Sequence, residues 1–287
     1  MPELPEVEAV RRQLAPLLTN ARIADVDLRR PDLRAPFPPD FRRRLKGKRV
    51  ASLERRAKYL IATLSSGDAL LVHLGMSGSF VVQPRERARR ARTARRVLDR
   101  HDHVVISTTA GAVIVFNDPR RFGLMTLLTP EERARHPVLS RLGPEPLSSD
   151  FDARALARAV RRRTSSLKAA LLDQRVVAGL GNIYASEALH LAGLSPLRRA
   201  STIATPTGEP RPAAFRLAGA IKRVLRTAIS RTTARGAYRG GRFRVYDREG
   251  ERCLRAGCSG TIVRRTQAGR STFYCPVCQP VRGLGAG

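Results

Sequence analysis

The stretch GLGNIYASEALHLAGLSP, residues 179–196, joins a glycine-rich turn to a helical segment. The turn is tight, and Asn182 stands where a side chain can cap the start of the helix that follows. Backbone N–H groups at such a turn and helix start form an anion site that suits a DNA phosphate. Two roles for Asn182 therefore stay open on the residues alone, a phosphate contact and a simple helix cap. A helix–turn–helix at this point would bind the DNA backbone without reading bases.

Helical periodicity extends on both sides of this stretch. Apolar residues recur at three- and four-residue spacing in residues 152–163, 166–177, 182–193 and 212–230. These segments predict a helical domain over residues 151–232. Three consecutive arginines at 161–163, which include Arg163, form a basic cluster suited to phosphate.

All four cysteines lie beyond this domain, in a C-x4-C-x16-C-x2-C pattern formed by Cys253, Cys258, Cys275 and Cys278. Two close pairs separated by a hairpin-length stretch suit one tetrahedral Zn²⁺ site, with Zn–S distances of about 2.3 Å. Four thiolates leave no open position for water, so the zinc is expected to be structural. Redox pairing of the cysteines is the alternative. The pattern predicts a loop and a four-cysteine zinc finger over residues 233–287.

The segment between the cysteine pairs, GTIVRRTQAGRSTFYC (residues 260–275), is typical of a β-hairpin with QAGR at its turn. This places Arg270 near the hairpin tip. On a basic protein such an arginine is either a phosphate ligand or a solvent-exposed side chain.

Before the helical domain the pattern changes to short strands. Eight runs rich in β-branched residues or leucine are separated by turn sequences, and they favour a sandwich or a barrel: 23–29, 49–55, 59–65, 69–76, 79–83, 103–109, 112–118 and 124–128. A helix over residues 6–18 precedes them. The predicted architecture is multidomain α+β, with an N-terminal β domain over 1–129 and a linker rich in proline and serine over 130–150. The highly charged segment 84–100 is expected to be a loop.

The composition points to a polyanionic partner. The chain has 287 residues, which suggests two domains at roughly 150 residues each. Lysine and arginine total 54 against 24 acidic residues, and the net charge is +30. Such an excess favours nucleic-acid binding. No apolar run reaches about 18 residues and no signal pattern opens the chain, so we expect a cytoplasmic protein without a membrane span.

Two turns of the β domain carry side chains that are awkward to expose. HLGMSGSF contains Met76, and FNDPRRFG contains Arg120 and Phe122. If these side chains protrude, they are similar to wedges that enter a base stack and fill the gap left by a flipped nucleotide. The alternative is that Met76 and Phe122 belong to the core. Lys58, in ERRAKYL, stands among arginines whose like charge favours its neutral form.

Taken in order, these motifs resemble the bacterial formamidopyrimidine-DNA glycosylase family, which is grouped with endonuclease VIII. The resemblance covers nearly the whole chain through PELPEVE, RRAKYL, HLGMSGS, HDHV, DPRRFG, LGPEPLS, LLDQ, GLGNIYASE and the finger ending TFYC. It implies an N-terminal β-sandwich, a helix–two-turn–helix domain and a β-hairpin zinc finger. It also implies a monomer that binds damaged double-stranded DNA.

The resemblance implies chemistry at the amino terminus. After removal of Met1, Pro2 would be the nucleophile that forms a Schiff base with the sugar, followed by β,δ-elimination. Glu3 would be the general acid/base beside it. Lys58 would contact phosphate and assist catalysis near the damaged base, and Arg270 would grip phosphate and assist the second elimination.

The DNA-contacting residues implied by the resemblance are His73, Met76, His101, Arg120, Phe122, Arg163, Asn182, Tyr246 and Arg270. Among these, Met76, Arg120 and Phe122 match the void-filling wedge.

The chain departs from the family pattern in two places. The first cysteine pair is spaced C-x4-C where C-x2-C is usual, a spacing that zinc sites tolerate. The segment SRTTARGAYRGGRFRVYD, residues 230–247, is several residues short where members carry a loop over the extruded oxidised purine. The PELPE start favours oxidised purines as substrate, whereas the short segment favours oxidised pyrimidines or abasic sites. A catalytically silent damage-binding protein is the third hypothesis, against which Pro2, Glu3 and Lys58 argue.

Overall fold

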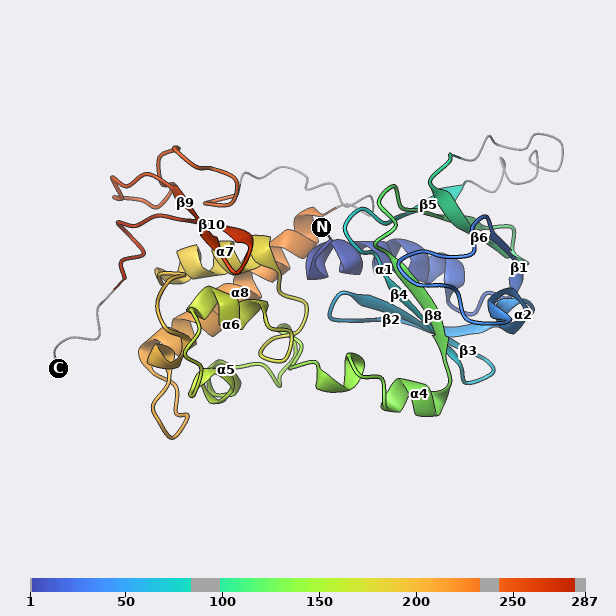
Figure 1. Ribbon diagram of the computed structural model, residues 1–287, viewed down its shortest axis with the longest axis horizontal. Coiled ribbons are helices and arrows are strands. Elements are labelled where there is room, and N and C mark those ends of the chain that lie inside the picture. The colour runs from blue at the N-terminus through green and yellow to red at the C-terminus, as the bar shows by residue number, and fades with distance from the viewer. Residues whose placement is uncertain (1, 84–98, 233–242, 282–287) are drawn as a thin grey trace. The chain divides into compact units, whose positions relative to one another are not determined.

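The computed structural model describes residues 2–83, 99–232 and 243–281 (Figure 1). The chain forms two units, one of Met1–Ser140 with Thr232–Arg239 and the other of Arg141–Arg231 with Gly240–Gly287. Most of the charged segment expected to be a loop, 84–100, and most of the short segment 230–247 lie outside the described residues.

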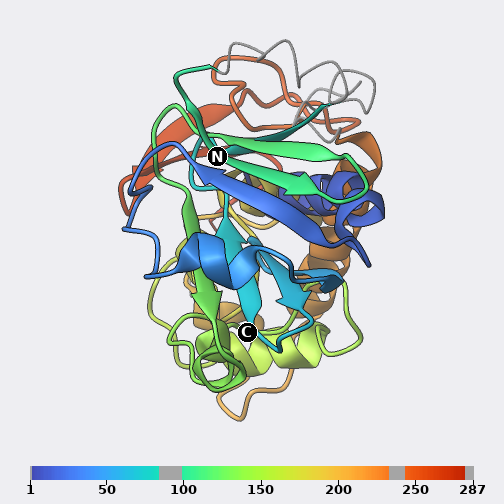
Figure 2. The same ribbon diagram turned by 90° about the vertical axis from the view of Figure 1, so that its right-hand side faces the viewer.

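The first unit contains a β-sandwich of two four-stranded antiparallel sheets, with strand orders β1-β6-β7-β5 and β2-β3-β4-β8 (Figures 1 and 2). All eight predicted strands are confirmed, and the sandwich is formed rather than the barrel. The strands are β1 Ile23–Leu28, β2 Val50–Arg56, β3 Tyr59–Leu64, β4 Ala69–His73, β5 Ser79–Gln83, β6 Asp102–Thr108, β7 Val113–Asn117 and β8 Leu124–Leu128.

Helix α1 (Leu4–Leu18) packs on β2 and β3 and contributes one face to the sandwich core. Its buried residues Val7, Val10, Leu14 and Leu18 recur at three- and four-residue spacing and join the apolar cluster between the sheets. The helix begins two residues earlier than the predicted start at residue 6. Its first turn closes because the Glu3 N–H donates to the Glu6 carboxylate at 2.8 Å, as in a capping box.

The structure also contains short helices, in the first unit and at its boundary with the second, that periodicity did not predict. Helix α2 (Phe41–Leu45) buries its two terminal apolar side chains. Helix α4 (Pro130–Ala134) and the 3-10 helix η1 (Leu139–Arg141) lie within the segment expected to be a linker. Helices of five residues are too short for a periodic pattern to be detected.

The second unit consists of helices and a two-stranded hairpin. Its elements are α5 Ala153–Val160, α6 Leu167–Leu172, α7 Asn182–Ala192, η2 Ala200–Ile203, α8 Pro212–Arg231, β9 Val263–Gln267 and β10 Arg270–Tyr274. Helix α7 packs against α8 and against β10. The predicted hairpin is confirmed, with Ala268 and Gly269 at its turn in left-handed conformations.

The helix predicted over 166–177 is too long, because α6 ends at Leu172. Asp173 leaves the helical conformation, and the next turns are fixed by the Gln174 side chain. Gln174 donates to the carbonyls of Leu172 and Leu180 at 3.1 and 2.9 Å and accepts from the Gly179 N–H at 2.8 Å. A side chain that satisfies three backbone groups replaces the helical hydrogen bonds of this segment.

Candidate active site and nucleic-acid interface

The amino-terminal residues lie at the start of α1. Pro2 is half-buried, and the Glu3 side chain that follows it is almost fully enclosed, with the residue 1 % exposed. Because α1 begins at Leu4, the helix fixes the backbone immediately after both residues. The first unit therefore holds a proline and a buried carboxylate next to each other directly before α1.

A second polar group of the first unit forms where β3 and β4 pair. His73 lies opposite Tyr59 in the ladder, with their ring centroids 4.9 Å apart. Burial, followed by the positive charges of Lys58 and Arg34, lowers the pKa of His73 to about 4. Its Nδ1 accepts the Gly75 N–H at 3.0 Å, so the neutral ring carries its proton on Nε2. His73 therefore offers a neutral N–H donor at pH 7, close to the positive charges of buried Lys58 and of Arg34.

Met76 and Phe122 are not core residues. They are 40 % and 42 % exposed, so the core alternative is wrong for both. The guanidinium of Arg120 lies over the Phe122 ring, 4.9 Å from its centroid. The three side chains come from the two turns in which the sequence placed them.

Buried Asp118 joins these two turns, and sequence reasoning missed it. Its carboxylate accepts from the Ser77 hydroxyl at 2.6 Å and from the Gly123 N–H at 2.7 Å. A Cβ built on Gly75 would lie 2.3 Å from the Phe122 backbone, so only glycine allows this close approach. The aspartate of DPRRFG was visible in the sequence, but its partner lies 41 residues away.

His101 is half-buried beside the same turn. Its carbonyl accepts the Asp118 N–H at 3.0 Å, and its Nε2 accepts from the Arg100 guanidinium at 3.0 Å. The backbone just before β6 and the turn that carries Arg120 are thus held together. His101 and Arg120 consequently belong to one region of the first unit.

In the second unit, Asn182 does not cap α7. Gly181 occupies the N-cap position, and the Asn182 side chain instead donates to the Ser271 carbonyl at 3.0 Å. Its Oδ1 is buried without a hydrogen-bond partner among the described residues. The cap interpretation is therefore wrong, and Asn182 links the start of α7 to the finger hairpin.

Lys168 reinforces this link and was missed in the sequence. It is buried, and its Nζ donates to the Ser271 carbonyl and to the Thr272 hydroxyl, both at 2.8 Å. Ser271 follows Arg270, whose side chain is exposed at the start of β10. The helical part of the unit thereby fixes the backbone beside Arg270 while the guanidinium stays accessible. The scarcity of lysine in this arginine-rich chain was the only signal.

Arg163 forms an ion pair rather than standing free. Its Nη1 lies 2.8 Å from an Asp173 carboxylate oxygen, and Arg175 binds the same carboxylate at 2.8 Å. Hydrogen bonds from Arg175, opposed in part by burial and aided by Arg163, hold the pKa of Asp173 well below its ordinary value. The aspartate fixes two arginines at the point where α6 ends.

Tyr246 is held at the base of the finger. Its ring packs on Phe273 with centroids 5.2 Å apart. The buried Glu187 carboxylate of α7 accepts three consecutive backbone N–H groups, from Arg244, Val245 and Tyr246, at 2.8, 2.9 and 3.0 Å. Glu187 was missed because nothing local in ASEALH indicates a partner 57 to 59 residues away.

The four cysteines form a metal site. Their Sγ atoms all lie within 4.8 Å of one another, with 3.8 Å between Cys253 and Cys278 and 3.7 Å between Cys258 and Cys275. Four thiolates about 2.3 Å from a tetrahedral Zn²⁺ have S···S distances of about 3.8 Å. The spacing therefore fits one structural zinc and is far longer than a disulfide.

The surroundings of the cysteines also fit a zinc-bound state. His190 of α7 places its Nε2 3.3 Å from Cys253 Sγ, where an N–H would stabilise a thiolate. A Cβ on Gly260 would lie 2.5 Å from Cys275 Sγ, so this position requires glycine. Arg255, within the longer C-x4-C knuckle, donates to the His190 and Leu191 carbonyls at the end of α7. The two additional residues of the knuckle are thus compatible with the metal site. The same knuckle is fixed to the end of α7 by Arg255.

These features define a two-unit protein with an N-terminal β-sandwich, a helical domain and a four-cysteine zinc finger. Residues 1–125 match the formamidopyrimidine-DNA glycosylase N-terminal domain, residues 142–237 match the H2TH domain of the same enzymes, and residues 250–281 match the zinc finger found in FPG and IleRS. The chain belongs to the formamidopyrimidine-DNA glycosylase family, the DNA glycosylases of base excision repair.

Relatives and solved structures agree with this assignment. The formamidopyrimidine-DNA glycosylases of Bradyrhizobium diazoefficiens and Rhodopseudomonas palustris are 54 % and 56 % identical, over 97 % of this chain and 100 % of theirs. The Lactococcus lactis Fpg bound to DNA containing an abasic site is 30 % identical with a TM-score of 0.83, over 97 % of this chain and 99 % of that one. The Thermus thermophilus MutM (Fpg) protein is 35 % identical with a TM-score of 0.80, over 98 % and 100 %.

Within the described part of the chain, no helix has the length and apolar character needed to cross a membrane.

Proposed function

We propose that this glycosylase removes oxidised purines, namely 8-oxoguanine and formamidopyrimidines, with Pro2 as nucleophile after removal of Met1. The observation that carries the proposal is the ordered start of α1, where half-buried Pro2 precedes the enclosed carboxylate of Glu3. A terminal amine has a pKa of roughly 7.7–8.0, so a neutral fraction is present near pH 7. Since such an enzyme acts on bacterial chromosomal DNA, we place it in the cytoplasm.

In the proposed reaction the neutral Pro2 amine bonds to C1′ of the damaged nucleotide, and the bond from C1′ to the base breaks with its electron pair leaving on the base; the proton that the Pro2 nitrogen loses balances the proton that the departing base takes up. Glu3 protonates the sugar oxygen as the ring opens, which produces an iminium ion. This cation acidifies the C2′ proton, whose loss expels the 3′ phosphate. A second elimination expels the 5′ phosphate. Zinc takes no part in these steps and would stabilise the finger fold.

The DNA-contacting residues divide between the two units. In the first unit, we propose that Met76, Arg120 and Phe122 fill the void left by the flipped nucleotide, with His73 and His101 nearby on the DNA side. Their support is the half-exposed state of Met76 and Phe122 at two turns joined by Asp118. Lys58 would assist catalysis near the damaged base.

In the second unit, we propose that Arg163, Asn182, Tyr246 and Arg270 grip backbone phosphates, and that Arg270 also assists the second elimination. Asn182 and Lys168 both hold the Ser271 carbonyl next to Arg270, which supports a fixed position for that guanidinium.

A second substrate class has a specific observation in its favour. The Lactococcus lactis Fpg, 30 % identical to this chain, has been solved in complex with DNA containing an oxidised pyrimidine. The same chemistry on oxidised pyrimidines or abasic sites is therefore the alternative proposal.

Borohydride trapping tests both proposals, using duplexes that carry 8-oxoguanine, an oxidised pyrimidine or an abasic site. A covalent adduct mapped to Pro2 by mass spectrometry on the 8-oxoguanine duplex is the expected result. Adducts only on the other two duplexes would support the alternative substrates. No adduct on any duplex would refute the assignment of Pro2 as the nucleophile.

Two variants separate chemistry from binding. Pro2→Gly should abolish lesion cleavage and spare DNA affinity, whereas Arg270→Ala should weaken affinity. Arg135→Ala, which removes an equal charge from an exposed position, is the matched control for Arg270→Ala. Equal loss of affinity in Pro2→Gly and Arg270→Ala would contradict the division of roles.

A further inference from the structure

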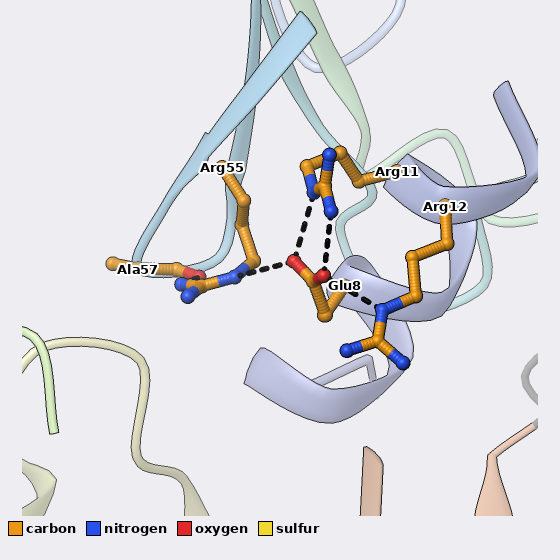
Figure 3. Close-up of polar contacts among 5 residues, drawn as sticks. All are labelled: Glu8, Arg11, Arg12, Arg55 and Ala57. Atoms are coloured by element: carbon orange, nitrogen blue, oxygen red, sulfur yellow. Dashed lines mark hydrogen bonds and ion pairs between the residues drawn. The ribbon is translucent and has the colours of Figure 1, made fainter. Parts of the chain in front are cut away.

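Glu8 of α1 holds three arginines on a single carboxylate (Figure 3). Arg11 donates to both oxygens at 3.0 and 2.8 Å, and Arg12 donates to one at 2.9 Å. Arg55, from β2, donates through Nε at 3.3 Å. Burial alone would raise the pKa of Glu8, but the hydrogen bonds of Arg11 and Arg12 and the charges of Arg11 and Arg55 lower it below its ordinary value. The carboxylate is thus charged and enclosed.

The three arginines are not equivalent. Arg11 and Arg12 lie one turn from Glu8 on the same helix, and the Arg12 side chain is 58 % exposed. Ion pairs within one helix turn, and exposed ion pairs, contribute little to the stability of the fold. Arg55 comes from 47 residues away, and its side chain is 11 % exposed. Only Arg55, among these contacts, joins α1 to the β2–β3 hairpin.

A second nitrogen of Arg55 contacts the hairpin turn. Its Nη1 donates to the Ala57 carbonyl at 2.9 Å (Figure 3). Ala57 has a φ of +53°, a left-handed conformation that a residue with a Cβ rarely adopts. Such a conformation persists when its surroundings hold it in place. The Arg55 fork, anchored by Glu8, contributes to this restraint.

The Ala57 carbonyl belongs to the peptide bond that leads into Lys58. A hydrogen bond that fixes the plane of this peptide also fixes the direction in which the Lys58 backbone leaves the turn. Lys58 is buried and close enough to His73 for its charge to lower the pKa of that ring. The direction of the Lys58 side chain therefore depends on the conformation of the turn that Arg55 holds.

Helix α1 also follows directly from Pro2 and Glu3. The chain Glu8–Arg55–Ala57 consequently connects the helix bearing the proposed nucleophile to the turn bearing Lys58. We propose that Glu8 and Arg55 are positioning residues that set Lys58 relative to the start of α1 for base removal. This inference rests on the proposed function, because it assigns a role that is exercised through Lys58.

The test compares Arg55→Gln with Arg12→Gln. Both substitutions remove one positive charge and one hydrogen bond to Glu8, but only Arg55 also reaches the Ala57 carbonyl. Single-turnover release of the damaged base at saturating enzyme is measured on the 8-oxoguanine duplex, or on the lesion the enzyme prefers. Arg55→Gln should slow this step roughly ten- to hundredfold with DNA affinity unchanged, because a small displacement of a catalytic group has effects of that size. Arg12→Gln should match the wild type.

A double-mutant comparison identifies the route of the effect. In a Lys58→Met background, adding Arg55→Gln should cause no further loss of rate, since both changes remove the same contribution. A merely structural role for Arg55 would lower the rate in both backgrounds. Arg55→Lys keeps the charge but offers one nitrogen for two acceptors, the Glu8 carboxylate and the Ala57 carbonyl. It should therefore also release the base slowly. This variant provides the test if Arg55→Gln does not fold.

Each outcome has a distinct meaning. Equal rates for Arg55→Gln and Arg12→Gln, or additive losses with Lys58→Met, would overturn the positioning role and leave the proposed function intact. A full rate for Lys58→Met alone would remove Lys58 from the proposed function and this inference with it. A covalent adduct that still forms in Pro2→Gly would contradict the proposed nucleophile, whatever the Arg55 variants do.

Discussion

Replacement of Glu187 by glutamine is expected to destabilise the base of the finger. The Glu187 carboxylate accepts three backbone N–H groups, two on Oε1 and one on Oε2, and the residue is 6 % exposed. Glutamine retains one oxygen and turns an NH₂ group toward at least one of these N–H donors. Bonds to a charged acceptor contribute roughly 1.5–3 kcal/mol and neutral ones roughly 0.5–1.5, while a buried unpaired donor costs roughly 1–3. The expected loss of unfolding free energy is about 3 kcal/mol.

Urea unfolding of the zinc-loaded protein measures this loss, and hydrogen exchange locates it. The amides of Arg244, Val245 and Tyr246 should exchange faster in Glu187→Gln than in the wild type. Glu209→Gln makes the same chemical change at an exposed position and should stay within about 0.5 kcal/mol of the wild type. A Glu187→Gln protein as stable as that control, with unchanged exchange at the three amides, would refute the reasoning.

Three further predictions concern the wedge, the metal and pH. Phe122→Ala should change unfolding free energy by less than about 1 kcal/mol, because the side chain is 42 % exposed, yet slow lesion removal; a large shift in melting temperature would contradict the exposure. Cys258→Ser or a chelator should release zinc, unfold the finger and weaken DNA affinity. Circular dichroism would follow the unfolding, and titration with labelled duplex would follow the affinity. Tight DNA binding by the metal-free protein would exclude a structural role for zinc. The folded-state pKa of His73, about 4, lies below its unfolded value of about 6.5, so its contribution is complete above pH 6.5 and is lost as pH falls toward 4. His73→Gln should therefore flatten the loss of stability between pH 6.5 and 4, and an unchanged slope in acid unfolding curves would count against this assignment.

The secondary structure of the β domain could be predicted because its signals are local. Each strand is a short run of β-branched or leucine residues bounded by turn residues, and all eight were found. The pairing of β1 with β6 and of β4 with β8 could not be predicted, because both pairings join residues far apart in sequence. Helix α6 was predicted too long for a different, local reason, since the side chain of Gln174 replaces helical hydrogen bonds just past the end of the helix.

Some features of the candidate site could likewise be predicted from the sequence, and others could not. The cysteine spacing is a sequence property, and it predicted the metal ligands because four thiolates at that spacing have few other uses. The exposure of Met76 and Phe122 is a tertiary property, because both side chains are apolar and the sequence alone equally allowed a place in the core. The role of Asn182 was open for the same reason, since its partner Ser271 lies 89 residues away.

The sequence by itself therefore determined the eight strands, the longer helices, the metal ligands, the strong positive charge and the family to which the chain belongs. These follow from local periodicity, from residue spacing and from total charge. The tertiary structure alone decided which side chains hold the elements around the candidate site: Asp118 between two turns, Glu187 and Lys168 at the base of the finger, and Glu8 with Arg55 between α1 and the turn before Lys58. These charged groups are buried, or largely enclosed in the case of Arg55, and each has a partner that becomes visible only when the folded chain brings distant backbone N–H groups, carbonyls and side chains within hydrogen-bond distance.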